Sequence, residues 1–336
     1  MDKIVHLTQD DLGYTPLSEA QAAEAGQQIA RIVGNIENVI RGKHQQVELT
    51  VLCLLAEGHV LIEDIPGVGK TSLVSALART IACDSKRIQF TPDVMPSDIS
   101  GFSIYNQKSG EFEFCPGAAM SNIVLADEIN RASAKTQSAM LEIMEERQVT
   151  MDGKTYALDP PFMVLATQNP IDSLGTYQLP EAQIDRFMIK FSLGYPSFSD
   201  ELLVVLTGKQ AKQDIQSVVT TRQVTQLIEA CGRVRVDRTV AAYIVRMVEA
   251  TRTHADVRLG ASPRGSIALY AMARAYALAQ GRNYVIPDDV KYLAPYVLAH
   301  RLILTQTAKA EKRDPAELIR TIAGQVVVPV DGSYAL

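Results

Sequence analysis

Short runs of consecutive apolar residues alternate with longer amphipathic stretches over the first 195 residues. The apolar runs that read as buried strands are residues 59–64, 87–90, 122–127, 164–167 and 187–193. They are short and bounded by polar, Gly or Pro residues, which is typical of strands in a sheet core. The stretches between them carry apolar residues at helical spacing, as at Leu73, Leu77 and Ile81. Strands that alternate with helices favour a parallel sheet covered on both faces.

Two stretches interrupt this alternation. Residues 102–115 alternate between apolar and polar positions around Ser109-Gly110, and residues 149–158 do so around Asp152-Gly153. Alternation around a short turn predicts a β-hairpin. We therefore expect two hairpins inserted into an α/β core.

The strand pattern ends at a Gly/Pro/Ser-rich break, residues 194–201. We place the domain boundary there, with an α/β domain at 1–195 and a small helical domain at 196–336. Every later apolar stretch has helical periodicity. Ser262 is expected to cap a helix with Pro263 in its first turn, and Pro287 opens another helix in the same way.

The composition narrows the class of protein. A chain of 336 residues with 47% hydrophobic positions can form about two domains with a large core. The formal net charge of −5 is spread without blocks of like charge, so no nucleic-acid partner is expected. The N-terminus lacks the apolar core of a signal peptide, and no stretch approaches the ~20 apolar residues needed to cross a bilayer. We expect a soluble cytoplasmic protein with no membrane insertion, whose four scattered cysteines are buried reduced thiols rather than zinc ligands.

The stretch from 61 to 78 contains most of a phosphate-binding loop. Gly69, Lys70 and Thr71 match the end of the pattern Gly-x-x-x-x-Gly-Lys-Ser/Thr, and they lie between a predicted strand and a predicted helix. Lys70 would reach the β- and γ-phosphates, and the Thr71 hydroxyl would bind Mg²⁺. The residues expected to surround the nucleotide phosphates are Pro66, Gly67, Val68, Gly69, Lys70, Thr71 and Ser72.

The first glycine of that pattern is replaced by Asp64. The missing glycine affects the turn that leaves the strand, where Asp is one of the few residues that tolerate unusual backbone angles. We expect the Asp64 carboxylate to point away from the phosphates, toward backbone N–H groups of the loop.

Two further strand ends carry polar residues. Asp127 ends the run 122–127 and Glu128 follows it directly, and the carboxyl ends of parallel strands meet at one edge of a sheet. Asp127 would hold Mg²⁺, and Glu128 would polarise the attacking water. Asn169 follows the run 164–167 and could bind the γ-phosphate or that water. The alternatives are a solvated strand end for the acids and an Asn-Pro turn for Asn169.

Two arginines complete the set. Arg186 either pairs with Asp185 or Glu181 on the surface or acts as an arginine finger on a neighbouring subunit's γ-phosphate. Arg264 lies at the start of a predicted helix, where a cation opposes the helix dipole. A nearby anion would make that placement tolerable, so a contact with the nucleotide is plausible.

In chain order, these motifs resemble the MoxR family of AAA+ ATPases over residues 35–330. The segments that carry the resemblance are PGVGKTS, the long block VLADEINRASAKTQSAMLEIMEERQVTMDG, ATQNPID, YQLPEAQIDRFMIK and GASPRGSIAL. The resemblance implies a five-stranded AAA+ core with inserts near 95–118 and 148–158, then a helical lid. It assigns Lys70 and Thr71 to Walker A, Asp127 and Glu128 to Walker B, Asn169 to sensor 1, Arg186 to the finger and Arg264 to sensor 2. It also matches Arg131, which it places at a subunit interface.

The resemblance further implies a MgATP-hydrolysing ring, typically a hexamer, with ATP between subunits and a chaperone-like role in activating or maturing partner proteins. The expected partner is a von Willebrand factor A domain protein or another client, and the inserted hairpins are its expected contacts. Two alternatives are kept. One is an AAA+ motor stimulated by nucleic acid, and the other is a scaffold that binds ATP without turnover.

Overall fold

The structure is a computed structural model that describes residues 15–65, 67–170, 177–207 and 215–328. The chain divides into two compact units. One comprises residues 31–225, and the other comprises residues 1–30 with 226–336.

The first unit is built on a five-stranded parallel sheet with the strand order β2-β5-β8-β1-β9. Its strands are β1 (Val60–Glu63), β2 (Ser85–Gln89), β5 (Ile123–Asp127), β8 (Met163–Gln168) and β9 (Ile189–Phe191). They overlap the five predicted apolar runs, although β2 begins two residues before its run and only Ile88 of its five residues is buried. β5 is buried along its whole length and β8 is buried over five of six residues, as expected where helices cover both faces. The α/β fold class with a parallel five-stranded sheet is confirmed.

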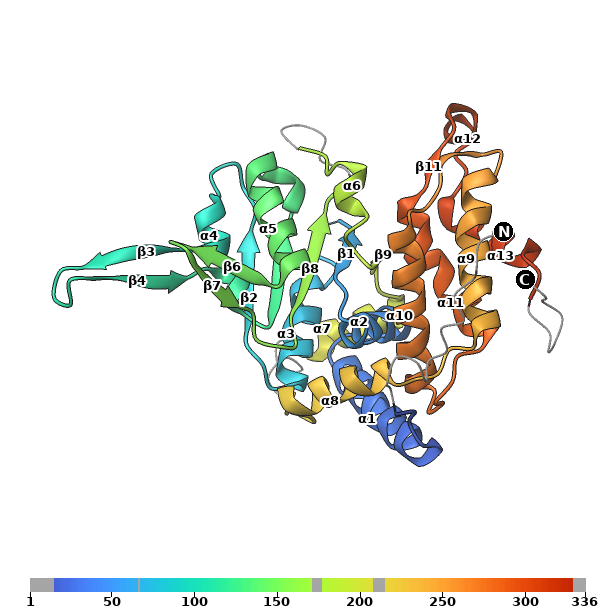
Figure 1. The fold of residues 1–336 in the computed structure, drawn as a ribbon, viewed down its shortest axis with the longest axis horizontal. Helices are drawn as coiled ribbons and strands as arrows, with labels where there is room; N and C mark the ends of the chain where they lie inside the picture. Colours follow the sequence, from blue (N-terminus) through green and yellow to red (C-terminus); the bar gives the residue numbers. More distant parts are fainter. Residues whose placement is uncertain (1–14, 66, 171–176, 208–214, 329–336) are drawn as a thin grey trace, which may run out of the picture. The chain divides into compact units, whose positions relative to one another are not determined.

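Helices and short helical turns surround this sheet in the first unit (Figure 1). They are α2 (His44–Leu55), α3 (Lys70–Thr80), α4 (Pro96–Ser100), η2 (Ala118–Met120), η3 (Ile129–Arg131), α5 (Ala134–Glu146), α6 (Glu181–Ile184) and α7 (Phe198–Thr207). Met140 and Met144 of α5 are buried against the sheet, which accounts for their helical spacing. α1 (Glu19–Glu37) and α8 (Thr221–Gly232) each run across a boundary between the units.

Both predicted hairpins are present, and neither joins the main sheet. β3 (Gly101–Asn106) pairs with β4 (Glu111–Pro116), and β6 (Gln148–Met151) pairs with β7 (Lys154–Ala157). The β3–β4 hairpin projects from the α/β unit (Figure 1). Its apolar side chains Ile104, Tyr105 and Phe112 are exposed, although Phe114 at its base stacks on Tyr156 of β7.

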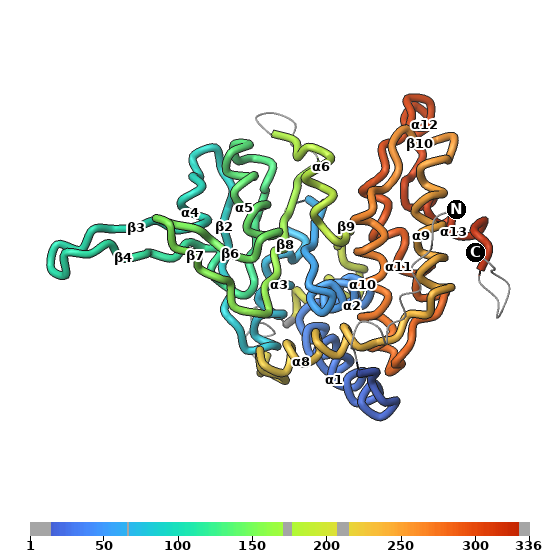
Figure 2. Tube along the Cα trace, in the orientation of Figure 1, coloured from blue at the N-terminus to red at the C-terminus, as the bar shows by residue number. Residues whose placement is uncertain are grey.

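The second unit is mainly helical. α9 (Arg238–Thr253), α10 (Pro263–Ala279) and α11 (Pro287–Leu298) lie side by side, as Figure 2 shows. The remaining elements are β10 (Val257–Leu259), η5 (Ala299–Arg301), β11 (Ile303–Leu304), α12 (Gln306–Ala310) and α13 (Pro315–Gln325). Ser262 caps α10, since its Oγ accepts the Arg264 N–H at 3.1 Å. The antiparallel pair β10–β11 was not expected, because strands of two and three residues leave no alternation to read.

The units divide at different residues from the expected boundary at 195/196. Residues 196–225 group with the α/β unit and residues 1–30 group with the lid. Hydrogen bonds to the α/β unit account for the first difference, because the Val218 N–H donates to Thr80 O of α3 at 3.0 Å. Asn35 Nδ2 likewise donates to Gln216 O at 3.0 Å. A local Gly/Pro/Ser break does not reveal such contacts between distant segments.

His59, directly before β1, joins three elements of the α/β unit. Its Nδ1 accepts the Val164 N–H of β8 at 3.0 Å, and its Nε2 donates to Met144 O of α5 at 3.0 Å. These two bonds require the neutral ring with the proton on Nε2. Burial lowers the pKa of His59 from 6.5 to about 4, and the nearby Arg147 contributes in the same direction.

This shift predicts a loss of stability in mild acid. The unfolded chain takes up a proton on His59 below pH 6.5, whereas the folded chain resists protonation until about pH 4, so stability falls as the pH drops through this window. At 1.36 kcal/mol per pKa unit, we expect a loss of about 2 kcal/mol between pH 7 and pH 5 from this residue. Urea titrations of the wild type and His59→Gln at both pH values check it. The variant should lose about 2 kcal/mol less, and equal losses in the two proteins would contradict the assignment.

Among the described residues, all four cysteines are free thiols, and no helix is long and apolar enough to cross a membrane. Cys53 and Cys231 are buried, whereas Cys83 and Cys115 are partly exposed. No cluster of three or more His, Cys, Asp or Glu side chains in this part of the chain could hold a metal.

Candidate nucleotide site

The loop between β1 and α3 has the backbone of an anion-binding turn. Gly67 and Gly69 have φ angles of 91° and 102°, and Gly69 is the N-cap of α3. Only glycine adopts such angles without strain. A Cβ at either position would meet no heavy atom within 4 Å, so the loop faces open space. The N-terminus of α3, with Val68 just before its N-cap and Ser72 in its first turn, is therefore available to an anion. Pro66 lies outside the described residues.

Lys70 is buried at the start of α3. Its Nζ donates to the carbonyl oxygens of Asp64 at 3.0 Å and Ile65 at 3.2 Å. Two carbonyl groups thus hold the ammonium group over the loop. Thr71 follows directly and carries the hydroxyl expected to bind the metal.

Asp64 does not point at the loop's anion site. Its Oδ2 accepts the N–H groups of Leu193 at 2.6 Å and Gly194 at 2.9 Å, and its Oδ1 accepts the Ile65 N–H at 3.2 Å. Ser192 Oγ donates to the same Oδ2 at 3.2 Å. The carboxylate is buried, and hydrogen-bond donors compensate its negative charge. Most of these donors lie in residues 192–194, directly after β9. The side chain therefore turns to backbone N–H groups as expected, but most of them lie outside the loop.

Asp127 ends β5, next to β8 in the sheet, and both of its carboxylate oxygens have partners. Oδ1 accepts the Thr167 hydroxyl at 2.6 Å. Oδ2 accepts Arg87 Nη2 at 2.6 Å and Nε at 3.2 Å. Neither Thr167 nor Arg87 was predicted from the sequence, because both reach Asp127 laterally from neighbouring strands.

Glu128 has a left-handed backbone, with φ 56° and ψ 49°. A non-glycine residue at positive φ is strained, and such strain is concentrated at functional sites. The Thr167 hydroxyl accepts the Glu128 N–H at 2.8 Å, so a single buried side chain fixes both acids. The Glu128 carboxylate pairs with Arg131 Nε at 2.9 Å. Arg131 thus contacts the acid within the same chain, and its predicted place at an interface stays a prediction.

Asn169 is buried immediately after β8. β8 lies between β5 and β1 in the sheet. The carboxyl ends of these three neighbouring strands therefore bring together Asn169, the acids at 127–128 and the Gly67–Thr71 loop. Donors, acids and an amide at one sheet edge suit the binding of a phosphate group with an oxygen-ligated cation and an activated water.

Arg186 lies at the amino ends of the strands, opposite the carboxyl ends that carry the Gly67–Thr71 loop and the two acids. It precedes β9, and Met188, two residues later, donates its N–H to His59 O at the start of β1. Its Nε pairs with Glu145 Oε2 of α5 at 3.1 Å, rather than with Asp185 or Glu181. The structure therefore does not bring Arg186 to its own chain's phosphate loop. Arg264 lies in the first turn of α10 in the second unit, and its role toward a nucleotide stays a prediction.

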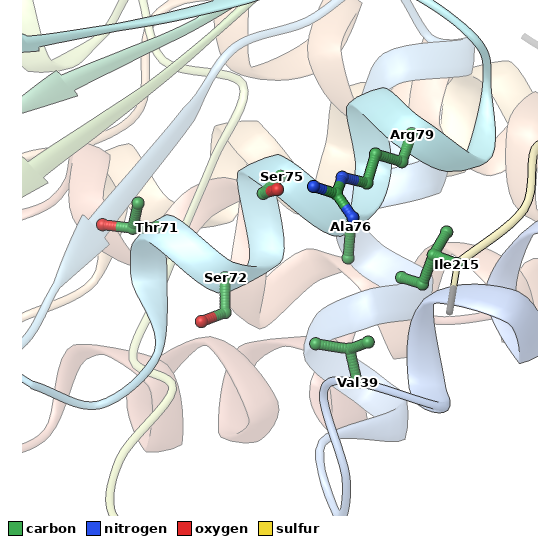
Figure 3. A pocket seen from close by; sticks show the side chains of 7 residues that line it. All are labelled: Val39, Thr71, Ser72, Ser75, Ala76, Arg79 and Ile215. Atoms are coloured by element: carbon green, nitrogen blue, oxygen red, sulfur yellow. The ribbon is translucent and has the colours of Figure 1, made fainter. Parts of the chain in front are cut away.

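A pocket of about 150 Å³ continues from the start of α3 (Figure 3). It is lined by Val39, Thr71, Ser72, Ser75, Ala76, Arg79 and Ile215. The lining thus combines apolar side chains with hydroxyl groups and one guanidinium group, which suits a ligand that has both apolar and polar parts.

Comparison with known proteins agrees with this geometry. A model of the ATPase family associated with various cellular activities (AAA) matches residues 59–189, and a model of the AAA lid domain matches residues 249–322. The chaperone MoxR1 of Mycobacterium tuberculosis is 43% identical over 93% of this chain and 85% of its own. This chain belongs to the MoxR family of AAA+ ATPases.

Two other relatives agree with this membership. The uncharacterised protein YeaC of Bacillus subtilis is 52% identical over 91% of this chain and 96% of its own. A solved protein of Cytophaga hutchinsonii, described as a candidate ATPase, has a TM-score of 0.86 at 39% identity and covers 93% of this chain and 98% of its own. A MoxR-type AAA+ fold with a nucleotide-binding core and a helical lid is thus established.

Proposed function

We propose that this protein is a MgATP-hydrolysing ring, built from six copies in the manner of its family, that remodels or activates partner proteins. The observation that carries the proposal is the strained Glu128, which lies beside Asp127 at the sheet edge that also holds the Gly67–Thr71 loop. A protein that only binds ATP needs no acid to activate water. The MoxR1 relative, which is named a chaperone, supports a role toward other proteins.

Each residue has a part in this proposal. The loop N–H groups and Lys70 bind the β- and γ-phosphates, while Glu128 orients the attacking water and takes its proton. Asn169 holds the γ-phosphate or the same water. Arg186 contributes from a neighbouring subunit, and Arg264 contacts the nucleotide from the lid.

The residues at this edge fit a Mg²⁺ ion, since the Thr71 hydroxyl and the Asp127 carboxylate are oxygen ligands of the kind that this cation prefers. These two residues would hold the ion. Bound Mg²⁺ would neutralise negative charge on the β- and γ-phosphate oxygens.

The proposed contact for a client protein is the β3–β4 hairpin. Tyr105 and Phe112 lie across from each other on one face, with ring centroids 5.3 Å apart, and both are exposed. Exposed aromatic side chains outside a core mark interaction surfaces. The net charge of −5 without a basic cluster disfavours a nucleic-acid motor.

Phosphate release measured over a range of protein concentrations tests the function. We expect MgATP turnover per subunit to rise as the protein assembles and to stay unchanged when DNA or RNA is added. Stimulation by nucleic acid would favour the motor, and single-turnover hydrolysis that stays at background would favour the scaffold. A pull-down with Glu128→Gln in ATP, repeated in ADP, would then identify a client bound only in the ATP state.

A further inference from the structure

Arg87 forms an ion pair with Asp127, whose carboxylate is proposed to hold Mg²⁺. It lies on β2, the edge strand, two residues before Gln89, whose partner across the sheet is Asp127. Side chains at i and i+2 of a strand share a face, so Arg87 extends along β2 toward Asp127. Both Nε and Nη2 donate to Asp127 Oδ2, and Nη2 also donates to Gln89 Oε1 at 2.6 Å.

Little of the Asp127 carboxylate is left for another cation. The Thr167 hydroxyl donates a hydrogen bond to Oδ1, and two N–H groups of Arg87 donate to Oδ2. A divalent cation at Asp127 must therefore displace Arg87 or bind beside a positive charge.

The two partners differ in their freedom to move. The Asp127 side chain is 12% exposed and fixed by Thr167, whereas the Arg87 side chain is 50% exposed. A half-exposed arginine on an edge strand can swing into solvent, and a bound cation would then compensate the buried Asp127 carboxylate in its place. The arrangement thus has a fixed acid and a movable counter-ion.

We propose that Arg87 is a displaceable counter-ion that competes with Mg²⁺ for Asp127 and so sets the metal affinity of the site. This inference rests on the proposed function. In the metal-free protein, Arg87 satisfies the carboxylate. When the metal and nucleotide bind, it gives up Asp127 Oδ2.

The test is the affinity for Mn²⁺, followed by electron paramagnetic resonance of the free ion, in the presence of a non-hydrolysable ATP analogue. Arg87→Gln removes the charge and keeps a hydrogen-bonding side chain, and we expect it to bind Mn²⁺ about three- to tenfold more tightly than the wild type. Arg87→Lys keeps a charge but loses the planar fork, and we expect about a twofold gain. Arg147→Gln is the matched control, because Arg147 pairs with Glu57 at the amino ends of the strands, away from Asp127. It should leave the Mn²⁺ affinity unchanged.

The outcomes separate the two proposals. Unchanged or weaker Mn²⁺ binding by Arg87→Gln, in a wild-type background that binds the Mn²⁺–analogue complex, overturns the role of Arg87 alone. Absence of Mn²⁺-dependent analogue binding by the wild type overturns both proposals. Should Arg87→Gln fail to fold in a thermal melt, Arg87→Lys decides, and no gain in affinity by that variant overturns the role.

Discussion

Glu128→Gln is expected to lower MgATP turnover at least 100-fold and to leave ATP binding within about threefold of the wild type. A general base contributes 10²–10⁴-fold to proton transfer, and the amide of Gln cannot accept the proton of the attacking water. Gln has nearly the same shape as Glu, and the Thr167 hydroxyl contacts the backbone N–H of residue 128, so the strained turn should persist. The loss should therefore fall on the chemical step.

Phosphate release and equilibrium binding of ATP, measured on the same preparation, separate the two effects. Glu142→Gln is the matched control, because Glu142 is exposed on α5 and carries the same change of charge away from the site. It should keep the wild-type rate. Turnover of Glu128→Gln at the wild-type rate would remove Glu128 from the mechanism and, with it, the observation that carries the proposed function.

The elements around the site could be predicted because each leaves a local pattern. The runs that became β1, β5 and β8 are apolar and bounded by polar or turn residues, and the acids at 127–128 follow one of them directly. The rule that parallel strands present ligands at their carboxyl ends then predicts that these acids, Asn169 and Lys70 lie together at one end of the sheet.

The side-chain contacts within the site could not be predicted from local pattern. Arg87 reaches Asp127 across a 40-residue separation, and Thr167 does the same from the other side. These contacts depend on strand order and register, which hydrophobic periodicity does not specify. Asp64 is a similar case. Its donors at 192–194 lie about 130 residues away along the chain. The sequence shows that Asp64 replaces a glycine of the motif, but it does not show which groups the carboxylate contacts.

Arg186→Ala is expected to reduce turnover at least 100-fold, and its activity should return in part when it is mixed with Lys70→Ala. Arginine fingers contribute 10³–10⁵-fold in related phosphoryl-transfer sites. Arg186 lies near the amino end of β1, whereas Lys70 follows the carboxyl end, and a four-residue strand separates the two edges by roughly 13 Å. Within one chain the arginine therefore faces away from the phosphates. Its present partner, Glu145, is 40% exposed and could be exchanged for an anion on a neighbouring copy.

The mixture tests whether the arginine acts between subunits. In a head-to-tail ring, an Arg186→Ala subunit supplies an intact loop and a Lys70→Ala subunit supplies an intact finger, so random equal mixing completes roughly a quarter of the interfaces. We expect a similar fraction of wild-type phosphate release, with neither variant active alone. Arg147→Ala, which removes another arginine from the amino edge of the sheet, should keep its rate without mixing. If oligomers verified to contain both variants recover nothing, Arg186 acts within its own chain or only through its ion pair with Glu145, and the ring model loses its shared active site.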